Sequence, residues 1–448
     1  NPQSGASKFI QIDIKEKLEN NTTYVFNFGE SVVDNNEGNP LPFFNYVFST
    51  GDYIDSLSIS GNIKNSFKRE PEEYISTFLY PIDENFSDSI IYNGLPNYVG
   101  STLDSTNFKM TNLKKGKYLL VAIKDENSNY KFDPEFEKIS FTSQPLNLPI
   151  SDSLELKLFK ETIPFESFKP FIETTNRIGF GFKGVTDDVK IKILNHQNIQ
   201  SILTKNKETD TLNYWFKEFK YDSLNFELST TNYKKNYTLK FKESDKDSLI
   251  ITSSIKSTLE LNEGFKVISN RPLVNVDPEK IKVFNKDSVS IPFDTYIDDN
   301  QFDVSLNFEV LPNDNYLVNI MPNAITDFFE STNDSLSYSF KTKSRADYGT
   351  LKLGFRNIQE FPVIVHLMNN KEDIIREIIL GSYEDPCLFE NLKPGNYFVR
   401  VLFDTNKNGV WDTGNFLKKI QPEKTFHYSE EIVIRKNWVL EEKIDLTF

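Results

Sequence analysis

The stretch Leu402-Phe-Asp-Thr-Asn-Lys-Asn-Gly-Val-Trp-Asp-Thr-Gly414 carries acidic and amide side chains at alternating positions. It has a near-copy upstream, Ile123-Lys-Asp-Glu-Asn-Ser-Asn-Tyr-Lys-Phe-Asp-Pro134. The aligned side chains are Asp404, Asn406, Asn408 and Asp412 in the later loop and Asp125, Asn127, Asn129 and Asp133 in the earlier loop. Two such loops at a constant offset of 279 residues predict that the chain repeats a domain.

The sequence before each loop repeats as well. The motif Asn-Leu-Lys-x-Gly-x-Tyr begins at Asn112 and again at Asn391, which keeps the same offset. A second pair of similar segments contains Tyr24-Val-Phe-Asn-Phe28 and Tyr316-Leu-Val-Asn-Ile320. We therefore expect an ordered pair of domains that occurs twice, with a loop-bearing domain second in each pair.

The apolar residues favour β-structure throughout. The chain has 39 Phe and 20 Tyr, and its apolar residues alternate with polar ones in short runs that end at Asn, Asp, Gly or Pro. At 448 residues it exceeds what one core supports. We predict an all-β, elongated string of about five β-sandwich domains with these ranges: a partial sandwich at 1–52, a loop-bearing sandwich at 53–162, a spacer at 163–268, a sandwich at 269–345 and a loop-bearing sandwich at 346–448.

The first domain is expected to lack its early strands. The later copy is preceded by strand-like sequence such as Ile281-Lys-Val-Phe284, and the first copy has little sequence ahead of it. An open sandwich exposes strand edges and apolar surface, which proteins rarely leave bare. Either further residues or a partner would cover that edge.

Charge and cysteine content restrict the function. The net charge of −14 argues against nucleic-acid binding, which needs a basic face. No apolar run reaches the ~20 residues of a membrane-spanning helix. The single cysteine, Cys387, cannot form an intramolecular disulfide and is interpreted as a small buried hydrophobe.

The later loop matches the first half of a calcium loop. Side chains at positions 1, 3, 5 and 9 would be Asp404, Asn406, Asn408 and Asp412, Gly409 would form the turn, and the Val410 carbonyl would be a ligand. The bidentate Glu expected at position 12 is missing, because that residue is Asn415. A hairpin loop whose side chains bond their own backbone is the alternative for both loops, and it is favoured at Asp125, where Tyr130 replaces the glycine.

Enzymatic motifs were sought and not found. The sequence has no Gly-x-Ser-x-Gly, no phosphate-binding glycine loop and no clustered histidines, since His196, His366 and His427 are far apart. Scattered tryptophans at Trp215, Trp411 and Trp438 argue against a carbohydrate-binding platform. We expect a non-enzymatic protein.

Two patterns resemble known families. The Tyr-x-Val/Phe-x-Ile/Phe segments with their downstream Asp resemble the bacterial Ig-like domain of the S-layer-protein type. The Asn-Leu-x-x-Gly-x-Tyr cassette resembles prealbumin-like, carboxypeptidase-regulatory-like sandwiches. Together they resemble Ig-like-domain envelope lipoproteins of Bacteroidota.

This resemblance implies a scaffold or accessory subunit of an outer-membrane protein assembly (barrel-assembly) or secretion complex. Its partners would be outer-membrane β-barrel proteins or other envelope lipoproteins, at the outer membrane, cell surface or periplasmic face. Membrane contact would come only through a lipid anchor absent from this chain. A calcium-dependent adhesin or glycan-binding protein is the main alternative, and an accessory region of a degradative enzyme is another.

The tripeptide Asp-Ser/Thr-apolar recurs and resembles the O-glycosylation sequon of exported Bacteroidota proteins. The alternative is that Asp-Ser or Asp-Thr simply ends a turn and the apolar residue starts a strand. The candidate acceptors are Ser56, Ser89, Ser105, Ser153, Thr211, Ser223, Ser248, Ser288 and Ser335.

Overall fold

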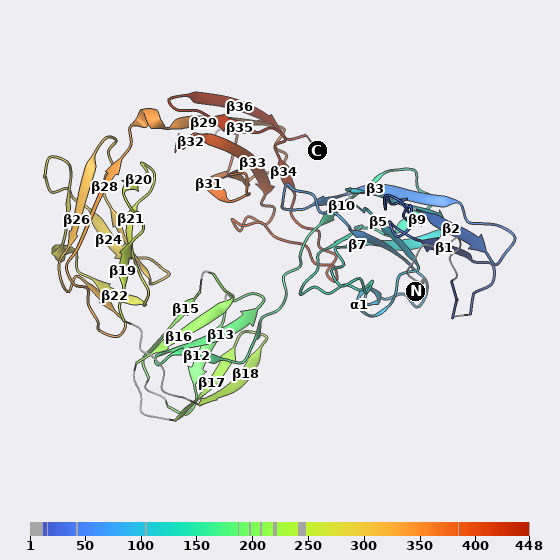
Figure 1. The fold of residues 1–448 in the computed structure, drawn as a ribbon, viewed down its shortest axis with the longest axis horizontal. Helices are drawn as coiled ribbons and strands as arrows, with labels where there is room; N and C mark the ends of the chain where they lie inside the picture. The colour runs from blue at the N-terminus through green and yellow to red at the C-terminus, as the bar shows by residue number, and fades with distance from the viewer. Residues whose placement is uncertain are drawn as a thin grey trace.

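The computed structural model describes residues 12–15, 17–41, 44–103, 105–186, 188–196, 199–206, 208–217, 222–240, 248–383 and 385–447. The predicted all-β class is confirmed (Figure 1). Within these ranges the helical elements are α1 (Ile90–Asn93) and the single 3-10 turns η1 (Pro278–Lys280) and η2 (Arg345–Asp347). Cys387 is buried in the last core, as predicted.

The second sandwich packs two sheets around one apolar core. Its sheets have the orders β10-β3-β6 and β5-β4-β7-β8, with β9 also paired to β7. The strands are β3 (Leu57–Asn65), β4 (Ser76–Pro81), β5 (Tyr98–Ser101), β6 (Asn107–Leu113), β7 (Gly116–Ile123), β8 (Ile139–Phe141), β9 (Leu146–Leu148) and β10 (Leu154–Leu158).

The last sandwich has the same topology strand for strand. Its sheets have the orders β36-β29-β32 and β31-β30-β33-β34, with β35 also paired to β33. In both sandwiches the tyrosine of the shared motif donates its hydroxyl hydrogen to the backbone four residues earlier, Tyr118 to Lys114 O at 2.9 Å and Tyr397 to Lys393 O at 2.8 Å. The strands are β29 (Gly349–Arg356), β30 (Val363–Met368), β31 (Ile374–Leu380), β32 (Cys387–Leu392), β33 (Gly395–Phe403), β34 (Thr425–His427), β35 (Ile432–Ile434) and β36 (Val439–Asp445).

The spacer is also a sandwich, with sheet orders β11-β13-β16-β15 and β14-β17-β18 and with β12 paired to β13. Its core includes Phe180, Tyr214 and Phe226, whose rings pack edge to face. The strands are β11 (Glu166–Ser167), β12 (Phe171–Thr174), β13 (Arg177–Lys183), β14 (Lys190–Ile193), β15 (Ser201–Lys205), β16 (Thr211–Phe216), β17 (Ser223–Ser229) and β18 (Lys234–Lys240).

The fourth unit is a sandwich of the sheets β19-β21-β25-β24 and β20-β28-β26-β23, with a separate β22-β27 pair. Its strands are β19 (Ile251–Ser253), β20 (Thr258–Leu259), β21 (Phe265–Ser269), β22 (Leu273–Val276), β23 (Ile281–Phe284), β24 (Asp294–Ile297), β25 (Asp303–Asn307), β26 (Asn315–Ile320), β27 (Ile325–Asp327) and β28 (Leu336–Thr342).

The predicted boundary between the spacer and this fourth unit, at 268/269, is wrong. Strand β21 pairs with β25, β19 pairs with β21, and β20 runs parallel to β28. The fourth sandwich therefore starts near residue 250. The error has a physical cause, because short strands such as Thr258–Leu259 give too few alternating positions to reveal which sheet they join.

The first unit is a hairpin of β1 (Thr23–Asn27) and β2 (Asn45–Ser49). Its register repeats that of β26 and β28 at a constant offset of 292 residues, because Tyr24 pairs with Phe48 as Tyr316 pairs with Phe340. Tyr24 OH accepts the Glu19 N–H at 2.7 Å, and Tyr316 OH accepts the Leu311 N–H at 2.8 Å. The hairpin thus reproduces part of the fourth sandwich in detail.

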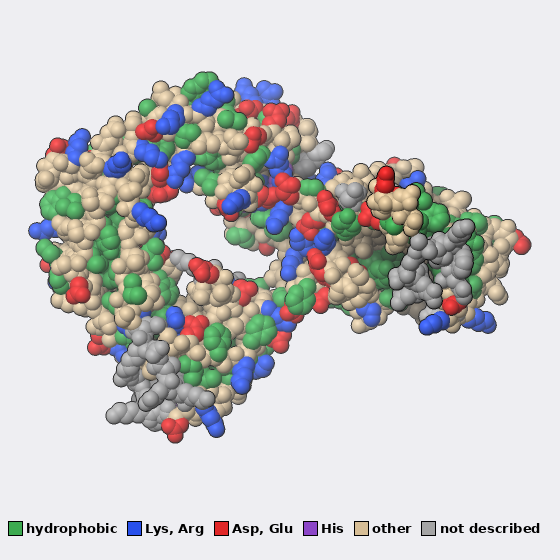
Figure 2. Space-filling view, in the orientation of Figure 1, with side chains coloured by type: hydrophobic (Ala, Val, Ile, Leu, Met, Phe, Trp, Pro, Cys, Tyr) green, Lys and Arg blue, Asp and Glu red, His purple; other side chains and the backbone are tan. Residues whose placement is uncertain are grey.

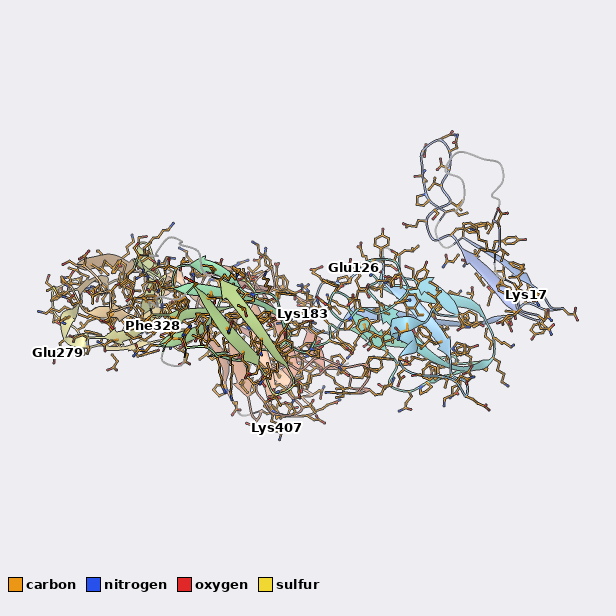
Figure 3. All side chains as sticks on the ribbon, turned by 90° about the horizontal axis from the view of Figure 1, so that it is seen from below. Lys17, Glu126, Lys183, Glu279, Phe328 and Lys407 are labelled. Carbon is orange, nitrogen blue, oxygen red and sulfur yellow. The ribbon has the colours of Figure 1, made fainter. Side chains whose placement is uncertain are left out.

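The string of sandwiches closes on itself. Figure 1 shows the last sandwich returning to the second, and Figure 2 shows an opening framed by the four sandwiches. Figure 3 shows the first unit, near Lys17, at the far end of the molecule from Glu279.

Specific contacts join each pair of neighbours around this ring. Lys183 pairs with Glu135 at 2.6 Å between the second sandwich and the spacer. Trp215 packs on Phe302 with ring centroids 6.1 Å apart between the spacer and the fourth sandwich. Lys393 pairs with Glu260 at 3.2 Å between the fourth and last sandwiches. The remaining contact, between the last and second sandwiches, completes the ring.

Candidate functional site at the contact between the two loop-bearing sandwiches

The two acidic loops have the same hydrogen bonds. Asp404 accepts the N–H groups of Asn408 and Gly409 at 3.0 and 2.8 Å, and Asp125 accepts those of Asn129 and Tyr130 at 3.2 and 2.9 Å. Tyr130 takes a left-handed φ of 61° where Gly409 has 82°, so the tyrosine tolerates the turn that was expected to need glycine. The prediction that the loops are copies is supported at the level of single bonds.

Each loop is closed by a glutamate that the sequence analysis missed. Glu423 accepts the N–H groups of Thr405 at 2.7 Å and Asp412 at 3.1 Å, and Glu137 accepts those of Glu126 at 3.2 Å and Asp133 at 2.8 Å. Burial, together with the negative charge of Asp125, raises the pKa of Glu137. Because Glu423 follows Asp412 by eleven residues and Glu137 follows Asp133 by four, no fixed spacing marks their shared role.

The donor set of the later loop suits a hard cation only in part. Among the described residues no group of three or more His, Cys, Asp or Glu is arranged to hold a metal ion. The Asn406 and Asn408 amides instead donate to Asp412 at 2.6 and 2.8 Å. Backbone and amide donors therefore satisfy the loop oxygens that calcium would need, and the calcium ligands proposed here, including Asn127, Asn129, Asp133 and Val410, stay a prediction.

Adding calcium to the chelated protein is expected to raise the melting temperature of the last sandwich, because binding to the folded state alone stabilises it. Replacing Asp404 with asparagine should abolish this increase, since one of the two carboxylates is lost. Differential scanning calorimetry with and without millimolar calcium measures the effect. An unchanged melting temperature in the parent protein would leave the loop as a turn held by its own hydrogen bonds.

The longer connection in the later loop crosses to the second sandwich. We call residues 413–422 the strap. Its Phe416 is fully buried in an apolar cluster of the second sandwich, where it packs edge-on against Phe141 with centroids 5.2 Å apart. The Phe416 N–H donates to buried Glu161, and Lys419 pairs with Asp88 at 2.5 Å. The strap therefore inserts one side chain into the core of another domain.

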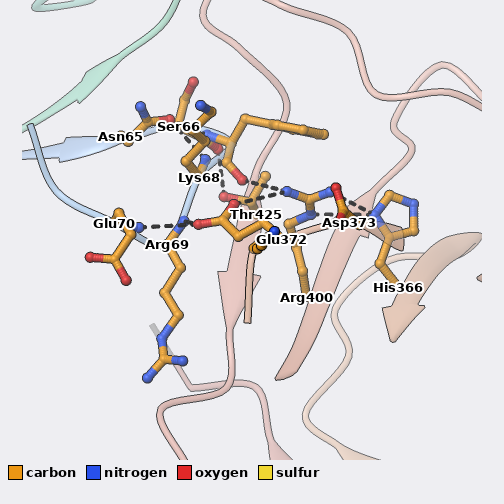
Figure 4. Close-up of polar contacts among 12 residues, drawn as sticks. Asn65, Ser66, Lys68, Arg69, Glu70, His366, Glu372, Asp373, Arg400 and Thr425 are labelled. Atoms are coloured by element: carbon orange, nitrogen blue, oxygen red, sulfur yellow. Dashed lines mark hydrogen bonds and ion pairs between the residues drawn. The ribbon is translucent and has the colours of Figure 1, made fainter. Parts of the chain in front are cut away.

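The second sandwich in turn packs on the last sandwich, where it covers the outer face of the sheet that contains β30 and β33. Arg400, on β33, is 2 % exposed and lies 3.8 Å from the centroid of the Phe67 ring. Its Nη1 donates to Phe67 O at 2.9 Å (Figure 4). The guanidinium carbon of Arg69 lies 4.2 Å from the centroid of the Phe398 ring. The backbone N–H of Arg69 donates to Glu372 Oε1 at 2.9 Å.

Two histidines lie beside Arg400, although their separation in sequence gave no hint of it. His366 and His427 are the register partners of Arg400 on the two neighbouring strands, β30 and β34. Burial and the charge of Arg400 lower the pKa of His427 to about 4 and also lower the pKa of His366. Burial lowers the pKa of Arg400 itself to about 10. The contact therefore buries a guanidinium between neutral imidazoles.

The glycosylation candidates differ in exposure. Thr211 is 8 % exposed within β16, so it is not accessible to a glycosyltransferase and its assignment is corrected. Ser105 and Ser223 are partly buried. The exposed candidates are Ser56, Ser89, Ser153, Ser248, Ser288 and Ser335. Intact-mass analysis of the native protein is expected to show added hexose, and peptide mapping is expected to place it on several of these exposed serines and not on Thr211.

The tryptophans form no platform. Trp215 is buried at the contact between the spacer and the fourth sandwich, and Trp411 packs on Phe67 with centroids 4.8 Å apart. Trp438 is exposed. In the part of the chain that the structure describes, no helix has the length and apolar character needed to cross a membrane.

Comparison with known proteins finds only distant similarity to solved structures. No protein-family model matches the chain, and no curated protein matches it. The SGBP-B protein of the Bacteroides ovatus mixed-linkage glucan utilization locus, solved with a mixed-linkage heptasaccharide, is 9% identical, with 93% of this chain and 99% of that chain covered and a TM-score of 0.20.

Two further solved structures are similarly distant. The major pilin subunit BcpA of Bacillus cereus is 12% identical, with 87% and 99% covered and a TM-score of 0.15. Domains 4–9 of the surface-layer protein SbsC are 6% identical, with 86% and 67% covered and a TM-score of 0.16. At these scores the similarity carries no argument about function, and the assignment of β-sandwich domains rests on the sheets themselves.

Proposed function

We propose that this protein is a non-enzymatic, extracytoplasmic scaffold whose ring of sandwiches holds partner proteins in a fixed arrangement. The observation that carries the proposal is the reciprocal contact, in which Phe416 enters the second sandwich and Phe67 covers the last. Such a contact fixes the positions of domains that would otherwise move independently.

The use of the buried polar groups supports a structural role. Glu161 accepts a strap N–H, Arg400 donates to Phe67 O, and Glu372 accepts the Arg69 N–H. Each of these groups is engaged across the contact between the two sandwiches. Catalytic groups are generally aimed at a cavity in which substrate can be placed, whereas these are aimed at another domain.

The resemblance noted in the sequence supplies the finer proposal. The partners would be outer-membrane β-barrel proteins or other envelope lipoproteins, with membrane attachment through a lipid anchor. The rival function, a calcium-dependent glycan-binding adhesin, would need an exposed aromatic platform. Trp215 and Trp411 are instead used in contacts between domains.

Affinity purification from detergent-solubilised membranes tests the proposal. The parent protein should recover β-barrel proteins. Phe416→Ala should recover less of them, because the contact that closes the ring of sandwiches is weakened. Leu417→Ala should match the parent, because Leu417 is 59% exposed. Recovery of no partner, together with measurable glycan affinity by calorimetry, would replace the scaffold proposal with the adhesin.

A further inference from the structure

The contact at Arg400 buries an imidazole among cationic groups. His427 is half-buried, and neither of its ring nitrogens nor Oε2 of Glu372 has a hydrogen-bond partner within the described residues. The Phe67 backbone and the Glu372 charge favour the protonated ring, but burial and the charge of Arg400 outweigh them. The charged groups that act on this imidazole are Arg400 from β33, Arg69 from the connection between β3 and β4, and Glu372 from the turn between β30 and β31. His366, on β30, bonds Arg400 through Nδ1 at 2.9 Å.

Positive charge already exceeds negative charge in this cluster while His427 is neutral. Arg400 and Arg69 bring two positive charges, and Glu372 brings one negative charge that lies 3.8 Å from Arg400 Nη1. Glu377 is engaged elsewhere, because its Oε2 lies 2.9 Å from His366 Nε2. A proton on His427 would add a third positive charge in a buried place with one carboxylate to offset it.

Both sandwiches contribute to this cluster, so separating the sandwiches divides it. Arg69 and the Phe67 carbonyl leave with the second sandwich, and His427, Arg400 and Glu372 remain on the last sandwich, where water then reaches them. Separation would therefore lower the cost of protonating His427.

We propose that this contact is a proton-operated latch, in which protonation of His427 drives the second and last sandwiches apart and opens the ring. The proposal concerns a conformational device and does not depend on the identity of any partner of the scaffold.

The direction of the effect follows from linkage. In the closed ring the pKa of His427 is about 4, and in the opened ring it would rise toward its ordinary value of 6.5 as burial is relieved, while Arg400 stays beside it. The open state then binds more protons between these two values, so closure weakens as pH falls through that window. The equilibrium between closed and open forms would shift toward open by less than roughly 300-fold across it, because Arg400 stays beside His427 in the open form.

Two other titrating groups at the contact must be separated from His427, namely His366, whose Nδ1 bonds Arg400, and Glu161. Glu161 accepts the Phe416 N–H, and burial raises its pKa. Its protonation in acid would weaken the strap. The pair Lys419 and Asp88 lies at the partly exposed edge of the strap. A Glu161→Gln variant therefore serves as the control for an acid effect that originates at the strap.

The test measures the distance between the two sandwiches in the full chain. Spin labels are attached to cysteines at Lys109 and Glu390, which are exposed on β6 and β32, in a Cys387→Ala background. Double electron–electron resonance should give one narrow distance distribution at pH 7.5 and a broader, shifted distribution at pH 4.5. Circular dichroism should show intact β-structure at both pH values.

His427→Gln decides the proposal. At pH 4.5 it should keep the narrow distribution of pH 7.5, whereas Glu161→Gln and His196→Gln should open as the parent does. An unchanged distance in the parent, opening of His427→Gln at the same pH as the parent, or loss of β-structure in place of opening would each overturn the latch. If His427→Gln does not fold, His427→Phe provides the same comparison without a titrating group.

Discussion

Replacing Phe416 with alanine is expected to lower the free energy of unfolding of the second sandwich by about 3–5 kcal/mol. The phenyl ring is fully buried among Phe141, Phe159 and Tyr92, and its loss leaves a cavity in the apolar cluster of the second sandwich. Denaturant unfolding would measure the change. It is followed by the fluorescence of Trp411, near the contact, in a background where Trp215 and Trp438 are replaced.

The matched control is Leu417→Ala. Leu417 is the next residue on the strap and is 59% exposed, so its truncation should change stability by less than about 0.5 kcal/mol. Small-angle scattering should show a larger radius of gyration for Phe416→Ala alone. Equal destabilisation by both variants would mean that the strap is not anchored by the phenyl ring.

Replacing Asp327 with alanine is expected to cost about 3–5 kcal/mol in the fourth sandwich. Asp327 is fully buried, pairs with Arg271 at 2.9 Å, and accepts the N–H groups of Phe329 and Ser331 at 2.9 and 2.7 Å. Its removal leaves the Arg271 charge buried without its partner and two N–H groups without their acceptor.

Two variants sharpen this second test. Asp327→Asn keeps an oxygen acceptor and should lose less than alanine, because the N–H groups remain partly satisfied. Asp334→Ala, at an exposed position in the following turn, should be close to neutral. Calorimetry that resolves the transition of the fourth sandwich measures all three. A neutral Asp327→Ala would show that the ion pair contributes nothing net to folding.

The repeats made the architecture predictable from sequence. The offset of 279 residues that links Asp125 to Asp404 also links equivalent hydrogen bonds, since a shared motif specifies a shared turn. Strand segments with clear alternation were located well, as with Tyr24–Phe28, which overlaps β1. Local pattern suffices for such features because period-two alternation is set by the strand itself.

The site could not be predicted in the same way. Phe416 lies in a polar connection, and the cluster that it enters is built from residues more than 250 positions earlier, such as Phe141 and Phe159. Arg400 occupies a strand position that is filled by Val121 in the earlier copy. The reason for an arginine there is the contact of its guanidinium with the Phe67 ring of another domain, which the local sequence does not reveal. Contacts between distant domains leave no periodic trace in the sequence.

The strap also sets an order of events during synthesis. The core that receives Phe416 is otherwise complete once Phe159 has been made, yet its last side chain is translated 257 residues later. At about 5–20 residues per second this delay is roughly ten seconds to one minute. The nascent second sandwich must pass that interval with an apolar vacancy at its surface, so we expect it to depend on chaperones until the ribosome has delivered the end of the chain.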